Sequence, residues 1–208
     1  MTRRAPLRLA ALVAVYLVVA IPFKAMNIIP GFSDVRPVTA LGAVYAVFFG
    51  PLGCLASGIG NLLADAADDA IRWTSIAGFA ANVLGPLLVW LFWTRVSRTP
   101  FSLRTARGLL KQCLAVLAAA LLETAIIPPA VALVYPEVDV ALFAWSVFGN
   151  TAGFPILLGI PLAIILQEEF GLAPHDPRLP APPCPAPPTI NFQLFTLPFQ
   201  PLPPTSNL

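Results

Sequence analysis

Five polar side chains lie inside or at the ends of long apolar stretches of this sequence, where a charged or amide group is costly. They are Asn61, Asp65, Asn82, Glu123 and Asn150. In membrane-spanning helices such groups usually face an interior cavity or one another. A carboxylate in that position binds a cation, meets a polar ligand or carries a proton. The sequence therefore indicates a polar site inside an apolar bundle.

Four of these side chains fall at comparable depths on their helices. At about 1.5 Å of rise per residue, Asn82, Asn150 and Glu123 lie roughly 15 to 18 Å from the outer helix ends, and Asn61 about 10 Å. Polar residues placed at random would scatter over both leaflets, so this agreement indicates a pocket that opens outward. For the asparagines, hydrogen bonding between helices is an equally good interpretation.

The proposed pocket has two further candidate residues at its mouth, Arg36 and Trp73. An arginine suits a ligand that also carries a carboxylate or phosphate. A membrane-interface position explains Trp73 adequately, and stacking on a ligand is the weaker alternative. No lysine or arginine stands at mid-helix to pair with Glu123. We therefore expect a small polar or zwitterionic ligand with amine or amidine donors for the carboxylates.

The composition is typical of an integral membrane protein. Of 208 residues, 58% are hydrophobic and only 11% are charged, whereas a soluble domain has about 25% charged residues. Soluble enzymes, nucleic-acid-binding proteins and disulfide scaffolds are thereby largely excluded. Cys54, Cys113 and Cys184 form no CxxC pair, and His175 is the single histidine. We therefore expect no metal site, no cofactor and no enzymatic activity.

Apolar runs cover most of the first 166 residues. They span 9–23, 37–49, 51–64, 73–94, 108–134 and 140–166. The second and third are each shorter than the roughly 20 residues that a membrane helix needs, and they meet at the helix-breaking pair Gly50–Pro51. They could form one bent span or two short helices in a hairpin.

The distribution of positive charge favours the hairpin. Basic residues without acidic neighbours cluster at the N-terminus and in the connection 95–111; they are Arg3, Arg4, Arg8, Arg95, Arg98, Arg104, Arg107 and Lys111. The positive-inside rule puts both segments in the cytoplasm, which requires an even number of crossings between them. We therefore expect an all-α integral membrane bundle of six helices in the cell membrane, with both termini cytoplasmic. A cleaved signal peptide is the weaker alternative for the first helix.

The composition changes after residue 170. Twelve of the 24 prolines fall within 171–208, and proline at this density favours extended, unpaired backbone. The sequence predicts a six-helix transmembrane domain over 1–170 and a disordered cytoplasmic tail over 171–208.

The stretch 30–66, PGFSDVRPVTALGAVYAVFFGPLGCLASGIGNLLADA, is followed by SIAGFAANVLG at 75–85. It resembles the substrate-specificity (S) components of energy-coupling factor (ECF) transporters, in which an RP-type helix start, an FGP turn and a GxGNxxxD-like helix end recur. The matching residues are Arg36, Pro37, Phe49, Gly50, Pro51, Gly58, Gly60, Asn61 and Asp65. The resemblance is good over about 1–95 and rests on helix count alone over 108–167.

The resemblance implies a protein that captures a vitamin-like micronutrient outside the cell. It further implies a transmembrane coupling (T) subunit and two ATP-hydrolysing subunits as partners. An AxxxA pattern on the first helix commonly faces the T subunit in that family, and Ala10 and Ala14 match it. The chain has no nucleotide-binding loop of its own, so the partners must supply any ATP dependence. A membrane sensor or anchor without transport activity is the alternative function, and an intramembrane enzyme is a third.

Overall fold

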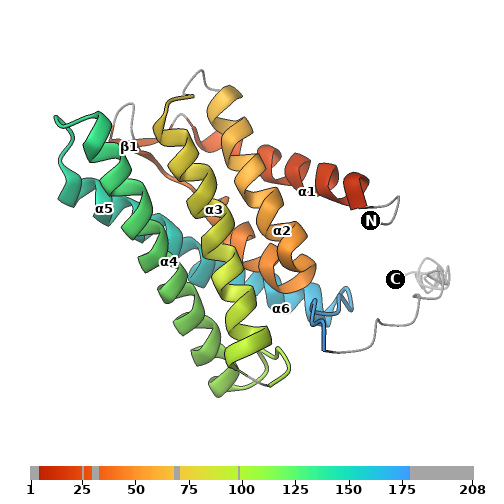
Figure 1. Ribbon diagram of the computed structural model, residues 1–208. Helices are drawn as coiled ribbons and strands as arrows, with labels where there is room; N and C mark the ends of the chain where they lie inside the picture. The colour runs from red at the N-terminus through yellow and green to blue at the C-terminus, as the bar shows by residue number, and fades with distance from the viewer. Residues whose placement is uncertain (1–4, 25, 30–32, 68–70, 98, 179–208) are drawn as a thin grey trace, which may run out of the picture.

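The computed structural model describes residues 5–24, 26–29, 33–67, 71–97 and 99–178 (Figure 1). Within them, five helical segments are long and apolar enough to cross a membrane: Ala5–Phe23, Thr39–Ala67, Thr74–Val96, Ala106–Val134 and Val140–Glu168. The elements along the chain are α1 (Ala5–Ala20), η1 (Ile21–Phe23), β1 (Asn27–Ile29), β2 (Ser33–Asp34), α2 (Thr39–Ala67), α3 (Thr74–Leu91), η2 (Phe92–Val96), α4 (Ala106–Val134), α5 (Val140–Phe148), η3 (Gly149–Gly153), η4 (Pro155–Gly159) and α6 (Ile160–Glu168). The protein is thus an all-α membrane bundle, as expected, with one small addition.

Helix α2 folds back on itself at Gly50. The backbone there has φ 58° and ψ −141°, a left-handed conformation that glycine adopts without a Cβ penalty, and Pro51 follows. A Cβ built on Gly42 would lie 4.0 Å from the Ser57 hydroxyl oxygen, although a straight helix would separate these residues by about 22 Å. The arms 39–49 and 51–67 therefore form the helical hairpin for which the Gly–Pro pair is suited.

The addition to the all-α expectation is a two-stranded antiparallel sheet between α1 and α2. Strands β1 and β2 pair Asn27 with Asp34 and Ile29 with Ser33. Beyond β2, the Val35 amide donates to the Met26 carbonyl at 2.8 Å. The segment between α1 and α2 is too short to form a further helix, and the backbone groups of its two strands hydrogen-bond to each other instead.

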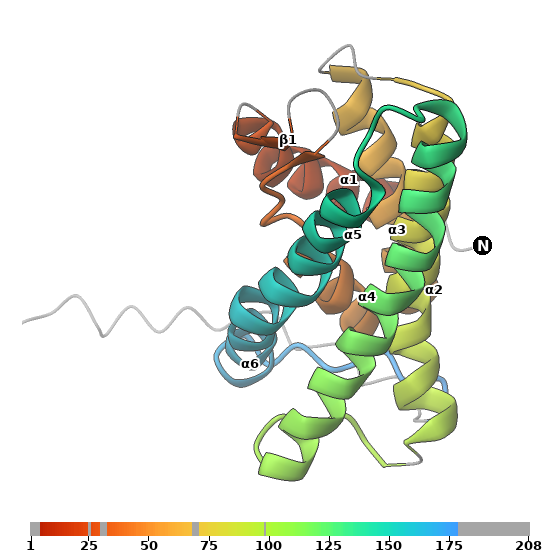
Figure 2. The same ribbon diagram turned by 90° about the vertical axis from the view of Figure 1, so that its left-hand side faces the viewer.

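The last long helix, Val140–Glu168, is interrupted by wider turns. Two five-residue π-helical turns, η3 and η4, separate α5 from α6. Pro155 and Pro161 lack the backbone N–H that a regular α-helix uses, and π-bulges occur at such places. Figure 2 shows this helix beginning beside α4 and diverging from it toward α6.

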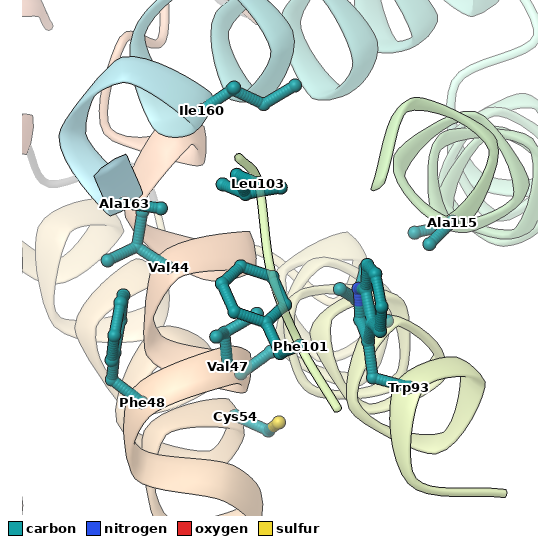
Figure 3. Packing of buried hydrophobic residues seen from close by; sticks show 13 residues of the cluster. Val44, Val47, Phe48, Cys54, Trp93, Phe101, Leu103, Ala115, Ile160 and Ala163 are labelled. Carbon is teal, nitrogen blue, oxygen red and sulfur yellow. The ribbon is translucent and has the colours of Figure 1, made fainter. Parts of the chain in front are cut away.

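The space opened by that divergence is filled at its far end by the α3–α4 connection. Phe101 and Leu103 of this connection are buried, and in Figure 3 Leu103 lies between Phe101 and Ile160. The Phe101 ring packs edge-on against Trp93, with 4.9 Å between ring centroids. The Trp93 indole donates to the Gln112 side-chain oxygen at 2.7 Å. This packing holds η2, the connection and α4 together.

Residues 171–178, which we call the C-terminal strap, lie against the hairpin turn of α2. The His175 amide donates to the Val47 carbonyl at 2.7 Å, and the Trp90 indole donates to the His175 carbonyl at 3.2 Å. The Arg178 guanidinium reaches the Trp93 carbonyl at 3.2 Å. Packed structure therefore continues past residue 170, where the tail was expected to begin. Residues 179–208 lie outside the described residues, and the tail stays a prediction.

Candidate functional site

Six polar residues from five parts of the chain meet at the end of the bundle that carries the small sheet. We call them the charge cluster; they are Lys24, Asp34, Arg36, Asn61, Asp65 and Asn150. Lys24 follows η1, Asp34 ends β2, and Arg36 precedes α2. Asn61 and Asp65 lie on the second arm of α2, and Asn150 lies in η3. The helix-breaking turn at Gly50 is what returns Asn61 and Asp65 to the same end as Arg36.

Ion pairs connect the basic and acidic members of the cluster. Lys24 Nζ lies 2.8 Å from Asp65 Oδ1 and 3.9 Å from Asp34 Oδ2. Arg36 Nε donates to Asp34 Oδ1 at 2.5 Å, and Arg36 Nη1 donates to Asn61 Oδ1 at 3.0 Å. Two cations thus face two carboxylates, and the cluster is neutral as a whole. Burial alone would lower the Arg36 pKa, but the Asp34 and Asp65 carboxylates raise it above its usual value.

The Asn150 side chain fixes the last helix to the start of α2. Its Oδ1 accepts from the Arg36 amide at 2.9 Å, and its Nδ2 donates to the Asp34 carbonyl at 3.0 Å. The Thr39 hydroxyl lies 2.8 Å from both the Arg36 and Asn150 carbonyl oxygens, and its one hydrogen is shared between these two acceptors. Asn150 therefore satisfies backbone groups of a non-helical segment as a neighbouring strand would.

A second group of polar residues lines a pocket beneath the cluster, which we call the Glu123 pocket. Its polar lining consists of Tyr16, Thr39, Asn82, Glu123 and Thr151, and its other walls are apolar or glycine. Tyr16 also lines the space below the charge cluster, and Thr39 bonds to the cluster directly. The two groups are therefore continuous from the sheet end toward the bundle interior.

Glu123 is buried in this pocket without a partner. Glu123 is 7% exposed, and across the described part of the chain its carboxylate takes part in no hydrogen bond or ion pair. A Cβ added to Gly85 of α3 would overlap the Glu123 carboxyl group, so glycine is what lets the two helices approach here. An unpaired carboxylate in a low-dielectric interior is costly unless it binds a proton, a cation or a ligand donor.

The other polar groups of the pocket are mostly committed as donors. Asn82 Nδ2 donates to the Gly78 carbonyl at 2.9 Å, and the Thr151 hydroxyl donates to the Val147 carbonyl at 2.9 Å. The Tyr16 hydroxyl lies 3.5 Å from Asn82 Oδ1, at the limit of a hydrogen bond. The pocket therefore offers acceptor oxygens, on Glu123 and Asn82, and one loosely held hydroxyl.

The pocket is narrow in this conformation. Its volume of about 20 Å³ has room for about one water molecule. A ring-sized ligand therefore needs the walls to separate. Within the described residues, no three acidic, histidine or cysteine side chains come together as a metal site would require.

Comparison with known proteins identifies the family. The QueT transporter family model matches residues 7–168. This range covers all five membrane-spanning candidates except the first two residues of Ala5–Phe23. The chain belongs to the QueT transporter family. It is therefore a multi-pass membrane protein that transports a small molecule, and it is not an enzyme, as the sequence predicts. No curated protein and no solved structure matches the chain significantly.

Most predicted site residues of this QueT family member gather in the two groups. Arg36, Asn61, Asp65 and Asn150 belong to the charge cluster, whereas Asn82 and Glu123 face the pocket. Trp73 does not join either group. It stands at the start of α3 with 81% of its surface exposed, because the α3 helix begins there and turns the indole outward.

Two predicted interface residues lie elsewhere on this QueT family member. Ala10 and Ala14 are both exposed on α1 and are one helical turn apart. No partner chain tests their role, which stays a prediction.

Sequence reasoning missed four residues that complete the site. They are Tyr16, Lys24, Asp34 and Thr39. Lys24 and Asp34 had a detectable signal, since charges of opposite sign flank the polar connection between the first two apolar runs. Tyr16 and Thr39 carried none, because a tyrosine or threonine in an apolar run is ordinary in a membrane helix.

Proposed function

We propose that this chain is the substrate-binding component of an uptake transporter for a queuosine precursor, a 7-deazaguanine base. The transporter family supports uptake of a small molecule, and the unpartnered Glu123 carboxylate is the observation that carries the binding site. The site binds its ligand in the Glu123 pocket, and the charge cluster closes that pocket on the side of the small sheet.

The proposed topology has six crossings, with the arms of α2 counted separately. The fold-back at Gly50 supports it, because each arm contacts the other and neither continues beyond the turn as a straight helix. Arg95, Arg104, Arg107 and Lys111 then lie at the cytoplasmic end, and the charge cluster lies at the outer end. Both termini are cytoplasmic in this arrangement.

Energy for uptake comes from partner subunits in this proposal. The sequence contains no nucleotide-binding loop, and a resemblance to the S components of ECF transporters suggests a T subunit with two ATPases. The exposed Ala10 and Ala14 give α1 a face of small side chains that a partner helix can approach closely. A sensor or anchor role would need an output domain, and no described element resembles one.

Binding of the purified chain to a 7-deazaguanine base tests this function. Isothermal titration of the full chain in lipid nanodiscs should give saturable, one-to-one binding, with adenine, thiamine and riboflavin as comparison ligands. Uptake of the radiolabelled base into cells that express the chain together with T and ATPase subunits should depend on ATP hydrolysis. Absence of 7-deazaguanine binding, or equal binding of all four compounds, would contradict the proposal.

A further inference from the structure

We infer that the Glu123 carboxylate binds the amidine edge of the base, formed by one ring N–H and the exocyclic amine, and so selects bases that carry that amine. This inference rests on the proposed function and names the chemistry by which the same pocket recognises its substrate. It makes Glu123 the residue that determines specificity.

The first support is the balance of donors and acceptors in the pocket. The Asn82 amide and the Thr151 hydroxyl already donate to backbone carbonyls of their own helices. Both Glu123 oxygens are free among the described residues. Apart from the loosely held Tyr16 hydroxyl, the described lining therefore has no uncommitted donor for the carboxylate, and a ligand can supply the missing donors.

The second support is the geometry of a carboxylate. Its two oxygens accept two parallel N–H bonds from a planar amidine or guanidinium-like edge, and such charge-assisted pairs are stronger than neutral ones. A 7-deazaguanine ring presents this pair of donors at adjacent positions, with a carbonyl oxygen next to them. The Tyr16 hydroxyl, held only at 3.5 Å from Asn82, is a donor available for that carbonyl.

The third support is the charge around Glu123. The lining residues from α1, α2, α3, α4 and the last helix include one other titratable side chain, Tyr16, and no lysine or arginine. The basic residues Lys24 and Arg36 are engaged with Asp34 and Asp65 in the cluster above. No described cationic side chain therefore pairs with Glu123, so its carboxylate is available to the N–H donors of a ligand.

The walls of the pocket fit a flat ring after they separate. Val89 and Val116 form apolar walls from α3 and α4, and Pro155 belongs to a π-helical turn of the last helix. A base is much larger than the cavity of about 20 Å³. Side chains added at Gly149 and Gly153 would meet nothing within 4 Å, so the last helix has open space beside it there, while Asn150 holds the helix to the start of α2.

A pair of ligands that differ by one amine tests the inference. Titration of the wild-type chain in nanodiscs with 7-deazaguanine and 7-deazahypoxanthine should give about 10- to 100-fold tighter binding of the first, the range for a hydrogen bond to a charged group. Glu123→Gln should weaken 7-deazaguanine binding by a similar factor and reduce the ratio between the two ligands. Glu137→Gln, which changes an exposed carboxylate outside the pocket, should leave the ratio unchanged.

The possible outcomes distinguish a failure of this inference from a failure of the proposed transport function. If the wild-type chain binds both bases equally, or if Glu123→Gln keeps the full ratio, Glu123 does not read the amine and the inference is wrong while the transport function stands. If the wild-type chain binds neither base, the proposed substrate fails and the inference fails with it. Glu123→Asp, which keeps the charge, should retain a ratio above that of Glu123→Gln, and size-exclusion profiles show whether each variant is folded.

Discussion

A single asparagine carries the connection between the last helix and the non-helical segment that precedes α2. Asn150 uses its acceptor for the Arg36 amide and its donor for the Asp34 carbonyl, while it is 6% exposed. Both backbone groups lie outside the helices, so no helical hydrogen bond satisfies them. The sequence signals a polar residue at depth here, but it does not distinguish this structural role from ligand binding.

Asn150→Ala should therefore destabilise the protein by about 2 kcal/mol, because it leaves a backbone donor and a backbone acceptor with no partner. The free energy of unfolding, followed by SDS titration in mixed micelles, measures the loss. Asn150→Asp keeps an acceptor for the Arg36 amide and should lose less. A wild-type midpoint for Asn150→Ala would mean that Arg36 and Asp34 find other partners, and that Asn150 is not the connection described.

At the scale of elements, the turn in α2 depends on one glycine and on what packs over it. Gly50 has φ 58°, and a Cβ there would lie 2.9 Å from Cγ of the His175 ring in the C-terminal strap. Gly171 has nearly the same backbone angle, φ 61°, but a Cβ there would meet nothing within 4 Å. Both glycines thus have a positive φ, Gly50 at a crowded position and Gly171 at an open one.

Gly171→Ala should cost about 1 kcal/mol, the penalty for a left-handed alanine. Gly50→Ala should cost more, because φ 58° with ψ −141° is a backbone region that essentially only glycine populates, and because the added Cβ collides with the His175 ring. The double variant Gly50→Ala/His175→Ala should recover part of that excess, since the strap hydrogen bonds use the backbone of residue 175. Unfolding midpoints of the four chains measure these differences; equal losses for both glycine variants would contradict the packing.

The boundaries of the apolar helices were predictable from sequence, and their irregularities were only partly so. The runs 73–94 and 108–134 correspond to Thr74–Val96 and Ala106–Val134, because hydropathy reports the need to satisfy backbone groups in lipid. The Gly50–Pro51 break was visible as a residue pair. The sheet at β1 and β2 was not, since a pairing of five residues leaves no periodic pattern.

The π-helical turns and the division of the polar residues were also beyond the sequence. Pro155 predicts a disturbed helix but not the wider turn that results. The common depth of the polar residues predicted one site for Asn61, Asn82, Glu123 and Asn150, whereas the structure divides them between the charge cluster and the adjoining Glu123 pocket. That separation depends on side-chain direction, which spacing along a tilted helix does not fix.

At the scale of the whole molecule, the orientation in the membrane is open to direct measurement. In a chain with Cys113→Ser and Cys184→Ser, Ala106→Cys should resist a membrane-impermeant thiol reagent in intact cells, because it begins α4 among basic residues. Glu137→Cys, at the opposite end of α4, should react. Both positions are exposed, and Cys54 is fully buried. The reverse pattern of labelling would overturn the topology.

The partner surface makes a separate prediction. Ala14→Trp should abolish co-purification with a T subunit, because a bulky side chain prevents close approach of a partner helix to α1. Val15→Trp adds the same bulk at an exposed position about 100° around the helix and should leave co-purification intact. Binding of 7-deazaguanine should survive in both variants. Equal co-purification of the two would assign the Ala10 and Ala14 face to lipid.

The C-terminal strap also has a consequence for how the chain is made. Val47 is synthesised long before His175, yet the Val47 carbonyl at the α2 turn receives its hydrogen bond from the His175 amide. During translation the hairpin turn therefore waits, with its carbonyl unpaired and the Trp90 indole without its acceptor, until the strap leaves the ribosome. A nascent chain that stalls after the last helix would present this unfinished turn to the proteases that survey membrane proteins, and its lifetime in the cell would report the moment at which the strap closes.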